Sequence, residues 1–239
     1  MTASRPAPAG NLRTLAVAVE GTCFAGKTTL ATALARRLRV VMIPEYAELA
    51  PLPPFPPRDH DDVRAALAYL RNLEIRRSAQ VRRARTPVVI LDRSPLSCIA
   101  FQYGMRRLGV PCDHRLAVEV FTDASTQRLI TPPEQYVYLH IDQTVALDRQ
   151  RDRGPVVACL MDPAAVEDMN RAYRHFLSRL APDRRLILDG SRPLASLFAE
   201  TSTFIATSRT DNGSPANDWR CLLDLPTQVR ASSAPGGPR

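Results

Sequence analysis

The chain has 239 residues, which is enough for one compact α/β domain with a tail and too few for two full-sized domains. Hydrophobic residues make up 45% of the sequence and charged residues 23%, a balance that excludes a wholly disordered chain. No apolar run approaches the roughly 20 residues that span a bilayer, and the N-terminal stretch lacks the apolar segment of a secretory signal. We therefore expect neither a membrane partner nor secretion.

Cysteine usage and net charge narrow the setting further. The five cysteines never form a C-x-x-C pair, which favours free thiols in a reducing cytoplasm over a disulfide framework or a zinc site. The net charge of +8 favours anionic partners, but the positive charge is dispersed and no recognition helix is evident, so nucleic acid is not expected. Of the 32 basic residues only Lys27 is lysine, which suggests that an arginine would not serve at this position.

Apolar strand patterns alternate with helical patterns along most of the chain, as in a mostly parallel sheet with helices on both faces. The predicted strands are Leu15–Glu20, Val40–Pro44, Pro87–Asp92, Tyr136–Ile141 and Arg185–Asp189. The predicted helices are Lys27–Arg39, Asp61–Ala84, Ser97–Leu108, Asp113–Gln127, Thr144–Arg151, Pro163–Leu180 and Pro193–Ala206. The expected fold class is therefore α/β, with a five-stranded parallel sheet in a three-layer arrangement.

Composition divides the chain into one domain and two ends. Residues 1–12 are predicted to be a flexible N-terminus and residues 13–206 to form the domain. Within the domain, the proline-rich stretch 51–57 is expected to be a stiff extended connector, because proline lacks the amide donor that helices and inner strands need. Residues 207–239, rich in Ser, Thr, Asn, Pro and Gly, are predicted to be a mostly disordered tail, with local docking of Trp219–Leu225.

The stretch 21–28 reads G-x-x-x-x-G-K-T and lies between an apolar strand and an amphipathic helix, the context in which this motif cradles phosphates. Glycines let the backbone curl so that its amides point at phosphate oxygens, and the helix N-terminus adds a partial positive charge. Lys27 is expected to reach the β and γ phosphates, while the Thr28 hydroxyl ligates Mg²⁺. The predicted nucleotide-binding residues are Gly21, Thr22, Cys23, Phe24, Ala25, Gly26, Lys27 and Thr28.

Two acids and an arginine lie at the end of predicted strands or directly after them, at the sheet edge where ligands of α/β proteins bind. Asp92 ends an apolar strand and is expected to hold magnesium, with Arg93 facing the same crevice, although Asp92 could instead cap the next turn. Glu45 marks the end of the second strand and could accept a proton from an attacking hydroxyl.

Every second residue from 149 to 153 is an arginine. This segment is predicted to be part of a lid over about 148–162. Arg149 and Arg153 would stabilise the charge of a migrating phosphoryl group, and Gly154 and Pro155 would let the segment hinge. The alternative is a solvated helix face. Most arginines of the predicted helix Asp61–Ala84 are expected to be solvated, with one or two facing the substrate as the alternative: Arg64, Arg71, Arg76, Arg77, Arg82 and Arg83.

Taken in order, these motifs resemble those of the thymidylate kinase and deoxynucleoside kinase superfamily of P-loop kinases. The resemblance is carried by Val19–Thr29, by Asp92–Gln102, by Tyr138–Asp142 with Leu147–Gly154, and by Asn170–Leu177. It implies a P-loop NTPase-type fold, ATP as the phosphate donor, Mg²⁺, and a possible homodimer. It also adds Thr29 to the nucleotide-binding residues.

The resemblance suggests roles for the residues singled out above. Asp92 would be the magnesium-linked acid and Arg93 a ligand of a phosphate or of the acceptor, while Arg149 and Arg153 would be clamps of the lid. Glu45 would activate the 5′-hydroxyl of a nucleoside. The chain departs from thymidylate kinases after the second strand, where it reads I-P-E-Y-A-E in place of R-E-P-G-G-T, and from deoxynucleoside kinases in having Asp92 where they have glutamate.

These observations predict a kinase that transfers the γ-phosphate of ATP to a small-molecule acceptor, a nucleoside or a nucleoside monophosphate. Two alternatives remain open from the sequence. One is a P-loop kinase that acts on the hydroxyl of a sugar, an aminoglycoside or another small metabolite. The other is an ATP-binding regulatory switch, against which the arginine lid and the D-R-S sequence after the third strand argue.

Overall fold

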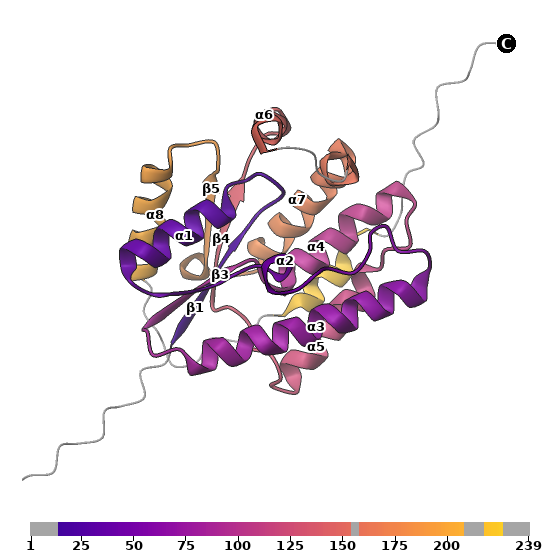
Figure 1. Ribbon diagram of the computed structural model, residues 1–239, viewed down its shortest axis with the longest axis horizontal. Helices are drawn as coiled ribbons and strands as arrows, with labels where there is room; N and C mark the ends of the chain where they lie inside the picture. The colour runs from indigo at the N-terminus through magenta and orange to yellow at the C-terminus, as the bar shows by residue number, and fades with distance from the viewer. Residues whose placement is uncertain (1–13, 154–157, 208–217, 227–239) are drawn as a thin grey trace, which may run out of the picture.

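The computed structural model describes residues 14–153, 158–207 and 218–226. Its centre is a parallel sheet of five strands in the order β2-β3-β1-β4-β5 (Figure 1). The strands are β1 (Leu15–Glu20), β2 (Val41–Ile43), β3 (Val88–Asp92), β4 (Gln135–His140) and β5 (Arg185–Asp189). This confirms the predicted fold class, and all five strands lie within the described part of residues 13–206.

Eight α-helices connect and cover the described strands. They are α1 (Lys27–Leu38), α2 (Tyr46–Leu49), α3 (His60–Arg83), α4 (Pro95–Met105), α5 (His114–Thr126), α6 (Gln143–Arg153), α7 (Pro163–Ser178) and α8 (Leu194–Thr207). Short 3₁₀ segments are η1 (Arg106–Leu108), η2 (Ala158–Met161), η3 (Pro182–Arg184) and η4 (Trp219–Asp224). No described helix is both long enough and apolar enough to cross a membrane.

Most of the predicted boundaries of helices and strands differ from the structure by one or two residues. One shifted boundary and one helix that was not predicted have a clear cause. Helix α4 begins two residues before the predicted start, because the Ser94 hydroxyl accepts a hydrogen bond from the Leu96 amide and Pro95 occupies the first turn, where its missing donor is harmless. Helix α2 was not predicted, because it is only four residues long and has no apolar periodicity of its own.

Alternate residues of the central strands face two different hydrophobic cores. Ala16 and Ala18 of β1 belong to a core shared with α3, α4, α5 and α7. Val17 and Val19 belong to a second core, shared with α1 and α8. Figure 1 shows the same division, with α1 and α8 on one side of the sheet and the other four helices opposite. The continuous apolar strand sequences are thus explained by burial on both faces.

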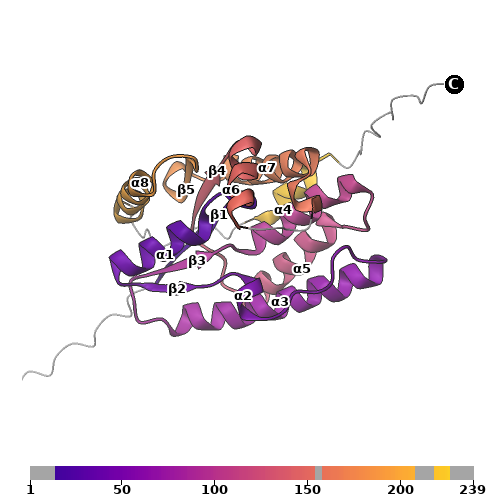
Figure 2. The ribbon, with the colours of Figure 1, turned by 45° about the horizontal axis from the view of Figure 1, so that its top comes forward.

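Parallel pairing brings the carboxyl ends of β2, β3 and β1 to one edge of the sheet. Val19 is paired with Asp92 across β1 and β3, and Ile43 is paired with Leu91 across β2 and β3. In Figure 2, the loop that follows β1 leads from this edge into α1. Residues that follow these three strands are therefore neighbours in space, although they are separated by dozens of positions in the sequence.

The predicted C-terminal tail is partly integrated into the domain. Residue Thr207 still belongs to α8, and the described segment 218–226 packs against α5 and α7, with Trp219 and Leu222 fully buried. The Arg106 guanidinium donates to the Pro226 carbonyl, and Arg115 donates to the Leu223 carbonyl at 3.3 Å. The expected local docking of Trp219–Leu225 is therefore confirmed, and Thr207 lies in α8. The mostly disordered tail stays a prediction for the rest of 207–239, which, like residues 1–12, lies outside the described residues.

Replacing Trp219 by alanine should lower the free energy of unfolding by about 3–5 kcal/mol, because a fully buried indole leaves a large cavity. Urea denaturation followed by far-ultraviolet circular dichroism measures this loss without depending on tryptophan fluorescence. The exposed neighbour Arg220, changed to alanine, should stay within about 0.5 kcal/mol of the parent. A loss below about 1 kcal/mol for Trp219→Ala would contradict the docking of η4.

Candidate active site

The loop between β1 and α1 has a backbone that its glycines make possible. Gly21 and Gly26 have φ values of 146° and 94°, in the region that side chains disfavour. A Cβ atom at Gly21 would lie 2.5 Å from the Leu139 carbonyl oxygen, so a larger residue does not fit there. Helix α1 begins directly after Gly26, and no described side chain caps its first amides. The loop therefore offers uncapped amide donors, which suit the oxygens of an anion.

The other residues of the predicted loop differ in their exposure. Thr22 and Ala25 are buried, whereas Cys23, Phe24 and Gly26 are half-buried. Thr28 and Thr29 are exposed in the first turn of α1. The structure thus gathers the predicted nucleotide-binding residues around one turn of backbone at the end of β1.

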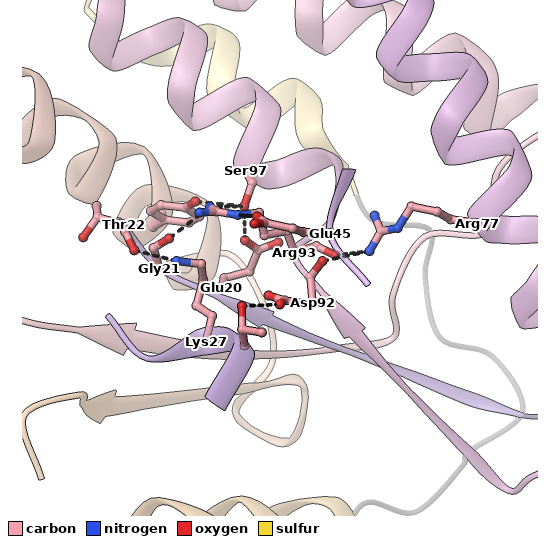
Figure 3. Close-up of polar contacts among 11 residues, drawn as sticks. Glu20, Gly21, Thr22, Lys27, Glu45, Arg77, Asp92, Arg93 and Ser97 are labelled. Carbon is pink, nitrogen blue, oxygen red and sulfur yellow. Dashed lines mark hydrogen bonds and ion pairs between the residues drawn. The ribbon is translucent and has the colours of Figure 1, made fainter. Parts of the chain in front are cut away.

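Lys27 is almost entirely buried, with 5% of its surface exposed. Its Nζ donates to the Thr22 carbonyl oxygen at 2.6 Å, so the ammonium group folds back over the loop (Figure 3). Burial and the positive charge of Arg93 lower the pKa of Lys27 to about 8. A polyanion bound in the loop would favour the charged form, which this environment disfavours.

Asp92 has the contacts expected of a residue that helps to hold a magnesium ion. Its side chain is fully buried at the end of β3, and its Oδ2 accepts a hydrogen bond of 2.5 Å from the Thr28 hydroxyl. Its Oδ1 is buried without a hydrogen-bond partner among the described residues, which is costly for a carboxylate. A hydroxyl and a carboxylate oxygen side by side are hard ligands that suit Mg²⁺ beside a phosphate, so these residues fit the ion.

Glu45 and Arg93, which lie 48 positions apart in the sequence, form an ion pair of 2.5 Å between Oε2 and Nε. The sheet explains this contact, because β2 and β3 are neighbours and each residue lies just beyond the end of its strand. A second hydrogen bond of 3.4 Å runs from Arg93 Nη1 to the Gly21 carbonyl oxygen. The two residues thus lie beside the loop, as Figure 3 shows.

Arg149 is the lid arginine that the structure brings to the loop. Its guanidinium donates to the Phe24 carbonyl oxygen at 3.0 Å and to the Gly190 carbonyl oxygen at 2.8 Å. Arg153 is exposed at the end of α6 and forms no ion pair within the described ranges. The predicted hinge at Gly154 and Pro155 lies outside the described residues, so the lid over 148–162 stays a prediction.

A buried carboxylate, Glu20, lies directly before the loop and has no role predicted from the sequence. Glu20 is fully buried, and its two oxygens accept hydrogen bonds of 2.5 Å from the Ser94 and Ser97 hydroxyls. Ser97 also lies 3.1 Å from the Tyr173 hydroxyl of α7 and 3.5 Å from Arg93 Nη1. An acid at the end of a continuously apolar strand was the available signal for this network.

Most of the arginines of α3 are exposed, as expected, but Arg77 is fully buried. Its Nη1 pairs with Glu74 Oε2 at 2.7 Å, and its Nη2 donates to the Asp92 and Arg93 carbonyl oxygens at 2.9 and 2.8 Å. The guanidinium satisfies backbone acceptors where the chain leaves β3, which is why burial is tolerated. The available signal was an acid and an arginine three residues apart on the same face as Leu73 and Val81.

Glu20 should make the free energy of unfolding depend on pH, because burial raises its pKa from 4.5 to about 7. The hydrogen bonds from Ser94 and Ser97 lower this pKa, but by less than burial raises it. Between these values the folded protein holds a proton that the unfolded chain has lost, so the free energy of unfolding should fall by up to about 3 kcal/mol as the pH rises through this window. Glu20→Gln, which does not titrate, should remove this part of the slope in urea denaturation at several pH values. The exposed Glu119→Gln should keep the parental slope; a Glu20→Gln profile parallel to the parent would contradict the assignment.

Comparisons with known proteins agree with the P-loop fold. A family model described as an AAA domain matches residues 16–181. No curated protein matches the sequence at a significant level. Among solved structures, deoxyadenosine kinase from M. mycoides with the products dCMP and dCDP bound is similar, with a TM-score of 0.63 and 18% identity over 81% of this chain and 100% of that one.

A thymidylate kinase from Candida albicans is also similar, with a TM-score of 0.62 and 15% identity over 82% of this chain and 92% of that one. These identities are low, so the likeness concerns the fold. The family match covers more than half of the chain and includes the loop, Asp92 and Arg149. The chain therefore belongs to the AAA domain family, with a P-loop fold like that of deoxyadenosine kinase and thymidylate kinase.

Proposed function

We propose that the protein is a kinase that transfers the γ-phosphate of ATP to a nucleoside or a nucleoside monophosphate. The observation that carries this proposal is the placement of the Glu45–Arg93 pair beside the phosphate-binding loop. Transfer to an acceptor needs a group that takes the acceptor's proton, and we assign this role to Glu45. The similarity to the two kinases adds support.

In this proposal the acceptor oxygen attacks the γ-phosphorus of ATP while the bond from that phosphorus to the bridging oxygen of ADP breaks. Glu45 takes the proton that the acceptor hydroxyl loses. Arg93 engages Glu45 through Oε2, and the second carboxylate oxygen of Glu45 makes no hydrogen bond with the described residues. That oxygen is the proposed proton acceptor.

Positive groups on the other side of the loop would neutralise the charge of the transferring phosphoryl group. Lys27 would exchange the Thr22 carbonyl for phosphate oxygens, and Arg149 already lies against the loop at Phe24. Thr28 and Asp92 would hold Mg²⁺, which supplies electrostatic stabilisation of the phosphates when bound. Arg153 would join only if the end of α6 moves toward the loop, as the lid hypothesis requires.

The pairing of Arg93 favours a nucleoside over a monophosphate as the acceptor. Glu45 already neutralises the guanidinium that would otherwise attract a second phosphate group. An uncharged hydroxyl therefore fits this side of the site better. Coupled ADP-release measurements with Mg-ATP against nucleosides, nucleoside monophosphates and sugars test the proposal. Acceptor-dependent ADP release should be highest with a nucleoside, and ADP release that no small acceptor stimulates would overturn the kinase function.

Lys27→Ala should reduce acceptor-dependent turnover by at least about 100-fold, because it removes the buried ammonium group from the charge-stabilising side of the site. Arg36→Ala is the matched control, since it removes one exposed cation from the same helix and should keep parental turnover. Steady-state kinetics together with calorimetry of ATP binding separate loss of binding from loss of chemistry. Full turnover by Lys27→Ala would refute the proposal.

Glu45→Gln should lower kcat by about 100-fold or more while ATP binding is retained, because the amide accepts no proton from the acceptor at neutral pH. Glu48→Gln removes the charge of an exposed residue one turn along the same chain segment and should change kcat less than about threefold. If both variants lose kcat equally, the effect is one of local charge, and Glu45 is not the base.

A further inference from the structure

Arg77 lies behind the candidate site, where its side chain has no access to solvent or to a ligand in the loop. Its Nη2 bridges the carbonyl oxygens of Asp92 and Arg93, which stand immediately before and after the Arg93 Cα atom. Arg93 has a φ of 66°, in the left-handed region that arginine rarely adopts. The two hydrogen bonds therefore fix the backbone on both sides of an unfavourable conformation.

The conformation of Arg93 matters because its guanidinium reaches two other chain segments. It meets Glu45 after β2 and the Gly21 carbonyl at the start of the loop. Figure 3 shows Arg93 between these groups, with Arg77 on the far side of Asp92. A change in the backbone at Arg93 would move its side chain away from both partners.

Arg77 also contacts the segment that carries Glu45. Its guanidinium lies over the Tyr46 ring, 4.6 Å from the centroid, and Tyr46 directly follows Glu45. The Tyr46 hydroxyl donates to Glu74 Oε2 at 2.9 Å, and the same oxygen accepts from Arg77 at 2.7 Å. We call this group of three residues the α3 hub: Tyr46, Glu74 and Arg77. The α3 hub connects both members of the Glu45–Arg93 pair to one long helix.

The geometry of the hub requires an arginine. Two nitrogens of a planar guanidinium serve a carboxylate and two carbonyls at once, while the flat face stacks on a ring. A lysine would keep the charge but has a single nitrogen and no flat face. Arg77→Lys therefore separates the charge of the side chain from its positioning geometry.

We propose that Arg77 is a positioning residue for phosphoryl transfer, which holds Arg93 and Glu45 in place through the α3 hub without touching either substrate. This inference rests on the proposed function for its kinetic consequence, but its structural consequence is independent of that function. The two are tested separately.

The kinetic test compares Arg77→Lys with Arg76→Lys, a matched control at the exposed neighbouring position. Arg77→Lys should lower kcat by about 10- to 100-fold, since small misplacements of catalytic groups have effects of this size. The KM for ATP should change less than about twofold, because Arg77 forms no hydrogen bond with Lys27 or the loop within the described residues. A merely structural role would lower the melting temperature and leave kcat per folded molecule unchanged; that result would overturn the proposal.

The structural test uses the Nε–H resonances of arginine in a ¹H–¹⁵N spectrum, with the Arg93 signal assigned from Arg93→Lys. In the parent and in Arg76→Lys, the Nε–H that binds Glu45 should be protected from exchange with water. In Arg77→Lys this protection should be lost, and an unchanged Arg93 signal would overturn the inference. If the parent shows no acceptor-dependent turnover, the proposed function fails, and this spectrum alone decides the role of Arg77.

Should Arg77→Lys fail to fold, Tyr46→Phe provides the second test, because it removes one hydroxyl from the α3 hub and leaves Arg77 in place. It should lower kcat by about 3- to 10-fold and raise the exchange rate of the Arg93 Nε–H, again with little effect on the KM for ATP. Parental values of both quantities in Tyr46→Phe would overturn the proposal.

Discussion

The parallel pairing of β1 with β3, and of β3 with β2, determines where the polar groups of the candidate site lie. Each of these strands ends at the same edge of the sheet, so the residues that follow them converge. The sheet positions three groups in this way: Glu20 and the loop after β1, Asp92 and Arg93 at the end of β3, and Glu45 after β2. A shift of one residue between β1 and β3 would separate Thr28 from Asp92, and a shift between β2 and β3 would separate Arg93 from Glu45. Either shift would also turn apolar strand residues out of the two cores.

This edge concentrates buried ionisable groups that are normally found in water. Three such groups are buried here: Glu20 at the end of β1, Lys27 at the start of α1 and Asp92 at the end of β3. Burial raises the pKa of Glu20 and lowers that of Lys27, so both charged forms are disfavoured by the surroundings. A bound polyanion with its cation would compensate the charges of Lys27 and Asp92. The site is thus arranged to gain electrostatic stabilisation from a ligand that brings charges of both signs.

The helices on the α3 face support the site from behind. Arg77 of α3 satisfies the carbonyls where β3 ends, and Tyr173 of α7 lies against Ser97, which in turn donates to Glu20. Helix α7 is itself held by η4, whose Trp219 is buried against α5 and α7. Through these contacts the C-terminal segment belongs to the same packed layer that holds Arg93. Stability and placement of the reactive groups are therefore linked on this face.

The sequence by itself determined the strand and helix order, the phosphate-binding loop and the identity of Glu45, Asp92, Arg93 and Arg149 as candidates. These features are local, since apolar periodicity, glycine spacing and the ends of strands are visible within short windows. Only the tertiary structure decided which of them meet. The Glu45–Arg93 ion pair depends on strand order, and the α3 hub depends on how a long helix packs against the end of β3. The sequence pattern puts Arg77 on the apolar face of α3, but it does not reveal that Arg77 meets the backbone carbonyls at the end of β3, because that contact depends on how the helix packs.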